Sequence, residues 1–108
     1  MTSFPVFLIN LAGSDARLAS ARSQLDTAGI AFERIDAVDG RKREATSFKV
    51  YDDTRARQFF GRSMASGEVG CYLSHVKAAQ AVLDSGAPYG LVLEDDFKAA
   101  PQAWPVLD

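Results

Sequence analysis

The amino-acid sequence predicts one α/β domain, residues 1–108, with a mainly parallel sheet. Its length suffices for a single domain with one hydrophobic core. Apolar runs typical of buried strands alternate with segments of helical spacing, which is the pattern of parallel strands joined by helices. The last apolar run stops at three consecutive carboxylates, Glu94, Asp95 and Asp96. Because ligands of open α/β sheets bind beyond the carboxyl ends of the strands, we expect the functional site at this cluster.

Composition and charge exclude several classes of protein. The apolar fraction of 47% and the charged fraction of 24% are ordinary for a soluble globular domain. The formal net charge of −2 gives no polybasic footprint, so we expect no nucleic-acid partner. No apolar run is long enough to span a membrane, and the N-terminus lacks the regions of a signal peptide. We therefore expect a cytoplasmic protein that reaches the inner face of the membrane, if at all, by peripheral association.

The first forty residues predict a strand, a helix and a second strand. Residues 4–10 form a continuous apolar run that suits a buried strand. Ser14 offers a helix N-cap, and Gly29 ends a segment with apolar residues at helical spacing. Residues 32–38 alternate apolar and polar side chains as a strand does, and Gly40 closes the turn that follows. Two strands joined by a helix predict a parallel pair with a right-handed crossover.

Residues 41–66 form a polar and basic insertion. They carry seven Lys or Arg residues against three acidic ones, together with four aromatic residues. We expect a short helix near residues 53–60. Long ordered insertions in compact domains are often functional, so one interpretation is a basic flap over an anionic ligand. The alternative is a solvated excursion anchored by its aromatic side chains.

The second half predicts a long helix and a third strand. Ser66 opens the helix and Gly86 closes it. A stripe of mostly apolar residues at helical spacing is expected to face the sheet: Val69, Tyr72, Leu73, Val76, Ala79 and Leu83. Residues 89–93 have the character of a buried strand, and residues 101–105 resemble the first turn of a further helix.

The acidic cluster after the third strand has two interpretations. Side chains on a strand alternate between its faces, so Glu94 and Asp96 are expected on one side and Asp95 on the other, if the backbone stays extended. Two carboxylates on one side suit a hard divalent cation, which prefers oxygen ligands. The alternative is that these residues are acidic only because the loop after the strand is exposed.

Cys71 and His75 are the only cysteine and histidine, and they lie one helical turn apart. A single cysteine allows no intrachain disulfide, and one His with one Cys does not complete a zinc site. A Cys/His nucleophile pair is conceivable, but we expect Cys71 to be a small buried residue and His75 to be structural or a general base. Gly67 and Gly70 at the helix start could expose backbone N–H groups to an anion, although no standard phosphate-loop motif is present.

Four blocks of sequence, in order, resemble glycosyltransferase family 25. They are residues 7–11 (FLINL) followed by Arg17, residues 32–40 (FERIDAVDG), residues 67–75 (GEVGCYLSH) and residues 93–96 (LEDD). The third block is long and specific. The family includes bacterial lipooligosaccharide galactosyltransferases and collagen galactosyltransferases, and the resemblance covers nearly the whole chain.

The resemblance implies a GT-A-like, Rossmann-like nucleotide-binding sandwich. It implies inverting transfer of a hexose, typically galactose, from a UDP-sugar to a hydroxyl of a glycan or lipooligosaccharide acceptor, usually with Mn²⁺ (or Mg²⁺). By the same resemblance Asp96 is the expected metal ligand with Glu94. Glu94 or Asp95 is also expected to contact the ribose or a metal-bound water.

The resemblance also assigns residues to the donor pocket. Asn10 and Leu11 are expected to line the uridine site, and Arg17 to help bind the nucleotide. Glu68, Ser74 and His75 lie in the most specific block and are expected to border the donor pocket. His75 is the only imidazole that could act as a catalytic base.

Members of the family generally continue well past the acidic motif, whereas this sequence ends at Asp108. We therefore expect a fold truncated at its C-terminus: a fragment, a short form completed as a homo-oligomer, or a remnant that binds nucleotide without transferring sugar. An incomplete nucleotide-binding or interaction module is thus the first alternative function. A phosphoacceptor signalling domain is the second, although its acidic pair would follow the first strand rather than the last.

Overall fold

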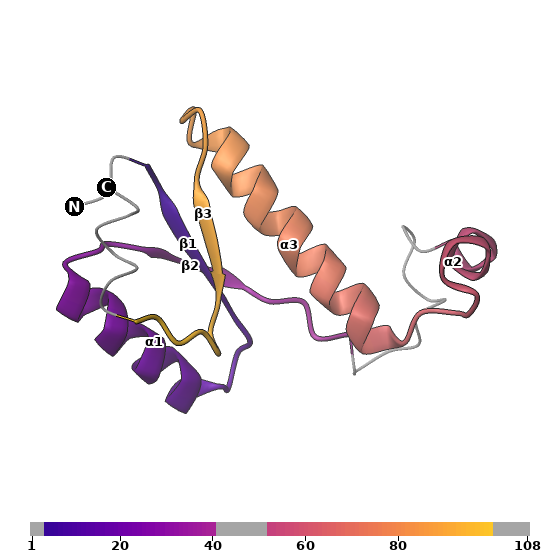
Figure 1. Ribbon diagram of the computed structural model, residues 1–108, viewed down its shortest axis with the longest axis horizontal. Coiled ribbons are helices and arrows are strands. Elements are labelled where there is room, and N and C mark those ends of the chain that lie inside the picture. Colours follow the sequence, from indigo (N-terminus) through magenta and orange to yellow (C-terminus); the bar gives the residue numbers. More distant parts are fainter. Residues whose placement is uncertain (1–3, 41–51, 101–108) are drawn as a thin grey trace.

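A computed structural model describes residues 4–40 and 52–100 of the chain. In these ranges it contains three strands and three helices in the following order: β1 (Val6–Asn10), α1 (Asp15–Ala28), β2 (Glu33–Asp36), α2 (Asp53–Phe60), α3 (Ser66–Asp84) and β3 (Leu91–Glu94). The strands form one parallel sheet in the order β2-β1-β3 (Figure 1). The predicted α/β class and parallel sheet are confirmed. The tail helix expected at residues 101–105 lies outside the described residues.

The strand order places a topological switch point between β1 and β3. The chain leaves β1 for β2 on one side, and then crosses to β3 on the other side of β1. Right-handed crossovers in opposite directions place their helices on opposite faces of the sheet. The side chains agree, because Val6 of β1 packs with Leu25 of α1, whereas Glu94, which shares the other face with Ile9, lies against α3. Figure 1 shows the two helices flanking the strands.

The core is built around β1. All five of its residues are buried, and Leu8 is fully buried together with Leu25 of α1. Partly buried apolar residues pack against this core, including Leu91 and Leu93 of β3 and Phe32, which immediately precedes β2. A central strand covered on both faces explains why residues 4–10 are continuously apolar.

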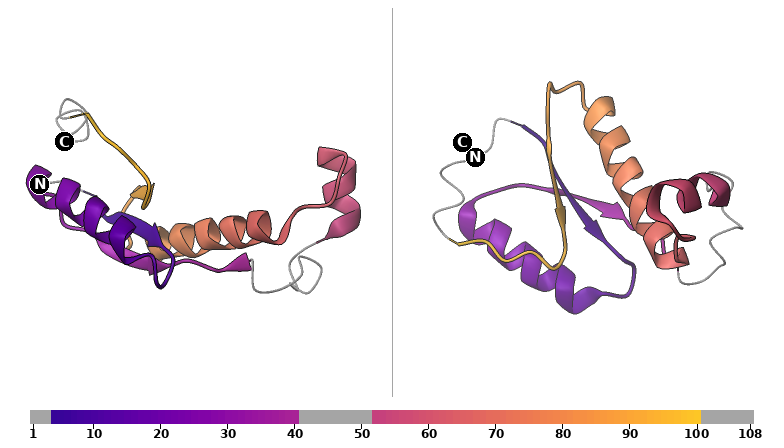
Figure 2. Two further views of the ribbon diagram at one scale, coloured as in Figure 1. Left: turned by 90° about the horizontal axis from the view of Figure 1, so that it is seen from below. Right: turned by 45° about the vertical axis from the view of Figure 1, so that its right-hand side comes forward.

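The helix boundaries follow the expected signals in part, because Ser14 precedes α1 without making a side-chain capping hydrogen bond and Ser85, rather than Gly86, is the C-cap of α3. Gly29 ends α1 with φ 72°, a left-handed conformation in which glycine has no Cβ penalty. Asp52 begins α2 by accepting a hydrogen bond from the Arg55 backbone N–H at 3.0 Å, and Gly61 ends that helix with φ 74°. The short helix predicted near residues 53–60 is confirmed as α2, which lies at the N-terminal end of α3, away from the sheet (Figure 2).

The prediction of the buried face of α3 is confirmed at Val69 but wrong for most of the stripe. Tyr72, Val76 and Leu83 are 59%, 45% and 72% exposed. The residues that face the sheet are mostly small: Val69, Gly70, Ser74 and Ala78. The physical reason is close approach, because a Cβ atom added to Gly70 would lie 2.5 Å from the backbone nitrogen of Gly40. The face of α3 that packs against the sheet is therefore determined by small residues that allow close approach, not by the most hydrophobic stripe.

Two aromatic residues of the insertion are also exposed. Phe59 and Phe60 of α2 are 77% and 65% exposed, so they do not anchor this segment in the core as the solvated-excursion interpretation expects. Residues 41–51, including the other two aromatics, lie outside the described ranges. Among the described helices, none is both long and apolar enough to cross a membrane.

Candidate functional site

A cavity of about 490 Å³ opens at the carboxyl ends of the three strands. Its walls come from the β1–α1 loop, the loop after β2, the first turns of α3 and the end of β3. The lining includes Leu11, Arg17, Ser74, Glu94 and Asp95. This is the crevice beside the switch point, where open α/β sheets bind their ligands. The structure thus brings these five residues together at one cavity.

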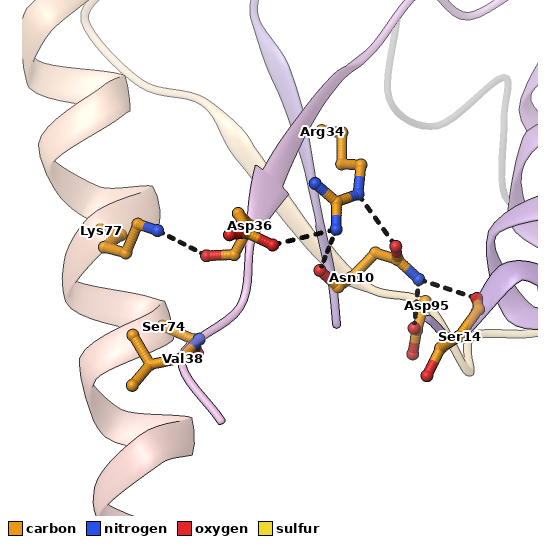
Figure 3. A network of polar contacts seen from close by, with 8 residues as sticks. All are labelled: Asn10, Ser14, Arg34, Asp36, Val38, Ser74, Lys77 and Asp95. Carbon is orange, nitrogen blue, oxygen red and sulfur yellow. Dashed lines mark hydrogen bonds and ion pairs between the residues drawn. The ribbon is translucent and has the colours of Figure 1, made fainter. Parts of the chain in front are cut away.

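Asn10, the last residue of β1, organises the floor of this region (Figure 3). Its side-chain nitrogen donates to Asp95 Oδ2 at 2.8 Å and to the Ser14 carbonyl at 3.2 Å, while its side-chain oxygen accepts from Arg34 Nε at 2.9 Å. Arg34 also donates to the Asn10 carbonyl at 2.9 Å. Asn10 is buried and is not among the residues that line the cavity. Its amide therefore joins β1, β2 and the end of β3.

Arg34 is a residue that the sequence reasoning missed. The alternation of residues 32–38 marked it only as a polar position of a strand. Its guanidinium also pairs with Asp36 at 3.1 Å, so it ties the end of β2 to Asn10. The available signal was a cation two residues from an acid on the same face of that strand.

Asp95 is held by two partners. In addition to the Asn10 amide, Arg17 Nη1 lies 3.6 Å from Asp95 Oδ1. The Asp95 side chain is 11% exposed, whereas that of Arg17 is 65% exposed. Arg17 therefore reaches from α1 over the cavity with much of its guanidinium accessible to a ligand.

Glu94 faces the opposite wall, formed by α3. Its Oε1 atom lies 3.6 Å from His75 Nε2 and 3.9 Å from Cys71 Sγ. The expectation that Cys71 is buried is wrong, because the helix turns this residue toward the cavity and solvent. Partial burial raises the pKa of the Cys71 thiol, and the charge and hydrogen bond of Glu94 raise it further. A raised pKa disfavours the thiolate that a nucleophilic cysteine needs.

Asp96 does not lie beside Glu94. The extended backbone ends at Glu94, and Asp95 and Asp96 follow in a turn, so the expected alternation does not reach Asp96. Asp96 instead lines a neighbouring hollow of about 300 Å³ with Arg17, Asp95 and residues of α1. Asp95 borders both spaces. The three carboxylates supply the oxygen ligands that Mn²⁺ or Mg²⁺ prefers, so the donor set fits such an ion in chemical type.

Glu68 makes structural contacts at the start of α3. Both carboxylate oxygens of Glu68 accept from Arg62, at 2.8 and 3.0 Å, and Oε1 also accepts from the Ala65 backbone N–H at 3.0 Å. The Arg62 hydrogen bonds, and then the Ala65 bond, lower the pKa of Glu68 to about 2. Glu68 does not line the cavity.

Ser74 joins α3 to the loop after β2. Its buried hydroxyl accepts from the Val38 backbone N–H and donates to the Gly70 carbonyl, both at 2.8 Å. This contact keeps the end of β2 close to the helix. Of the residues assigned to the site, the structure brings Leu11, Arg17, Ser74, Glu94 and Asp95 to the cavity, while Asn10, Glu68, His75 and Asp96 lie around it.

Comparison with known proteins gives a consistent result. The sequence model of a family described as "Glycosyltransferase family 25 (LPS biosynthesis protein)" matches residues 3–103. A glycosyltransferase 25 family member of Anopheles gambiae is 32% identical over 102 residues, which cover 89% of this chain and 17% of that protein. A probable inactive glycosyltransferase 25 family member 3 of Rattus norvegicus is 35% identical over 101 residues, covering 86% of this chain and 17% of the relative.

A further relative carries an activity in its name. Procollagen galactosyltransferase 1 of Danio rerio is 33% identical over 101 residues, covering 86% of this chain and 16% of that protein. The chain thus spans about a sixth of the length of these relatives.

Proposed function

The chain belongs to glycosyltransferase family 25, and we propose that it binds a UDP-sugar and supports transfer of a hexose to a hydroxyl acceptor. The observation that carries this proposal is the cavity at the switch point of a parallel sheet, bordered by Glu94 and Asp95 at the end of β3. Galactose is the proposed sugar, and a lipooligosaccharide or another cell-surface glycan is the proposed acceptor.

The cavity offers complementary walls for a nucleotide diphosphate. Ile9, Leu11 and Val38 provide apolar surface for a base. Arg17 provides an accessible positive charge for phosphate. Gly67, in the first turn of α3, also lines the cavity, and the N-terminus of a 19-residue helix favours an anion. These features support a GT-A-like placement of the donor, with the phosphates between Arg17 and the start of α3.

Carboxylates at the end of β3 would hold the metal ion. Asp96, which lines the neighbouring hollow, is the proposed ligand of Mn²⁺ or Mg²⁺; Glu94 is its proposed partner, but its side chain faces α3 and would have to turn toward Asp96. Such an ion stabilises the departing diphosphate when it is bound. Asp95 is already fixed by Asn10 and Arg17, so its proposed role is to orient the ribose and the Arg17 guanidinium. An acceptor hydroxyl must lose a proton to a base, and His75 beside Glu94 is the candidate among the described residues.

A donor-turnover assay tests this proposal. The protein is incubated with UDP-galactose, Mn²⁺ and lipooligosaccharide, and released UDP and galactosylated product are measured. We expect product from the unmodified protein, at least about a tenfold lower rate with Asp96→Asn, and an unchanged rate with Asp84→Asn. The control Asp84 lies at the other end of α3, where it accepts a hydrogen bond from Gln80. Product formed equally well by Asp96→Asn would contradict the assigned metal ligand.

A second candidate function is nucleotide binding without sugar transfer. Several relatives are named as inactive or probable inactive family members. In that case the protein binds UDP in the same cavity but releases no UDP from UDP-galactose. Binding without release would therefore favour this second function.

A further inference from the structure

We propose that Cys71, His75 and Glu94 form a binding site for a zinc-class transition-metal ion at the edge of the cavity. The potential ligand atoms of these three side chains all lie within 4.8 Å of one another. Cys71 and His75 come from adjacent turns of α3, and Glu94 comes from the end of β3. The proposed site shares Glu94 with the carboxylate pair assigned to Mn²⁺ and His75 with the assigned base, so it is tested without nucleotide.

The spacing suits three ligands of one ion. Zinc binds sulfur at about 2.3 Å and nitrogen or oxygen at about 2.0–2.1 Å, so tetrahedral ligand atoms are separated by roughly 3.3–3.6 Å. The observed separations are 3.6 Å between His75 Nε2 and Glu94 Oε1, and 3.9 Å between Cys71 Sγ and Glu94 Oε1. The Cys71 sulfur and the His75 nitrogen lie within 4.8 Å of each other, so side-chain rotation must bring this pair closer by up to about 1.3 Å.

The helix prearranges two of the ligands. Residues at i and i+4 lie side by side on a helix surface, which is the spacing of the paired histidines in helical zinc sites. Sequence alone offers Cys71 and His75 as a pair only, and two ligands do not make a site. The sheet supplies the third ligand, because Glu94 pairs with Ile9 of β1 and its side chain therefore lies on the face covered by α3.

The chemical type of the ligands selects the metal. A thiolate and an imidazole favour Zn²⁺ and similar borderline or soft ions, whereas Mn²⁺ and Mg²⁺ prefer sites made of oxygen. Three protein ligands leave one position of a tetrahedral ion open, as in catalytic rather than structural zinc sites. Cys71 and Glu94 both line the cavity, so this open position would face a water molecule or a ligand oxygen there.

Cobalt titration of the whole chain, without nucleotide and in the presence of a non-thiol reductant, tests the proposal. Co²⁺ occupies zinc sites and gives an intense near-ultraviolet charge-transfer band only when a thiolate binds it. The chain has one cysteine, so this band reports Cys71 alone. We expect one Co²⁺ per chain, a charge-transfer band, and displacement of Co²⁺ by Zn²⁺.

Variants identify the other ligands. Cys71→Ser should abolish the charge-transfer band. His75→Ala and Glu94→Gln should each weaken Co²⁺ binding by at least about 100-fold, because removal of an outer-shell partner alone already weakens metal binding by up to about 100-fold. Asp84→Asn should leave the band and its affinity unchanged. Cobalt binding without a thiolate band would overturn the proposal, as would a band that survives in both His75→Ala and Glu94→Gln or disappears in Asp84→Asn. The spectrum of the unmodified protein decides the first point even if a variant fails to fold.

Discussion

The close approach of α3 to the loop after β2 can be tested by adding one methyl group. In Gly70→Ala the new Cβ would lie 2.5 Å from the Gly40 nitrogen, 2.7 Å from the Val38 carbonyl oxygen and 2.9 Å from the Gly40 Cα. Ordinary van der Waals contact begins at 3.4 Å. All three neighbours are backbone atoms, so no side chain can rotate away, and the helix and loop must separate by roughly 0.5–0.9 Å. Overpacking of this kind costs about 1–3 kcal/mol, occasionally more.

Gly67→Ala is the matched control. It lies one turn earlier on α3, and a Cβ there would have no neighbour within 4 Å. Gly70→Ala gains about 0.8–1 kcal/mol of helix propensity and Gly67→Ala, in the first turn, gains less, so the difference between the two variants is a lower bound on the steric cost. We expect Gly70→Ala to be less stable than Gly67→Ala by about 1–3 kcal/mol, which is about 4–8 °C in melting temperature for each kcal/mol. Thermal unfolding followed by circular dichroism measures this difference in stability. Equal or higher stability of Gly70→Ala would refute the close approach of α3 to the loop after β2.

Three further predictions concern single contacts. The pKa of Glu68 is about 2, below the ordinary 4.5, so its contacts with Arg62 and Ala65 stabilise the fold fully above pH 4.5 and are lost as the pH falls toward 2. In urea titrations, the stability advantage of the unmodified protein over Glu68→Gln should therefore shrink as the pH falls through this range. A constant advantage would contradict this prediction. Asn10→Ala should lower the free energy of unfolding by about 2–4 kcal/mol in urea titrations, because Arg34 and Asp95 each lose the buried Asn10 amide as a partner. A loss below about 1 kcal/mol would be inconsistent with these hydrogen bonds. Ser74→Ala should cost about 1–3 kcal/mol by the same measurement because the Val38 N–H loses its acceptor, and an unchanged midpoint would count against this role.

Much of the fold follows from local patterns. The apolar run of β1, the alternation around β2 and the glycines that end α1 and α2 each specify an element by themselves. The short helix α2 also follows from local signals, since Asp52 caps its start and Gly61 ends it. Such features depend on neighbours in sequence, which is why sequence reasoning finds them.

The orientation of α3 does not follow from hydrophobicity. Tyr72, Val76 and Leu83 form the stronger apolar stripe, yet Gly70, Ser74 and Ala78 face the sheet. That choice depends on the distance between a helix and a loop from another part of the chain. A run of small residues at helical spacing was the available signal.

The site was predictable at the level of which elements meet. Parallel strands bring the end of β1 and the end of β3 to one edge, so Arg17, Glu94 and Asp95 could be expected near each other. The direction of each carboxylate could not, because it depends on where the extended backbone stops. Because the strand ends after Glu94, Asp96 lies in the following turn, while the pairing of Glu94 with Ile9 directs Glu94 toward Cys71 and His75.

Titration calorimetry of UDP into the protein, with Mn²⁺ or with a chelator, tests the central claim that the cavity beside β1 and β3 binds a nucleotide diphosphate. Arg17→Met removes the accessible charge at the cavity, and Arg22→Met makes the same change on the same helix, where the Arg22 guanidinium lies over the Phe32 ring instead. We predict metal-dependent binding that is weakened at least about tenfold by Arg17→Met and unchanged by Arg22→Met, because a charge-assisted hydrogen bond contributes about 1.5–3 kcal/mol. Absence of UDP binding under both conditions, or equal weakening by the two variants, would contradict the assignment of this cavity.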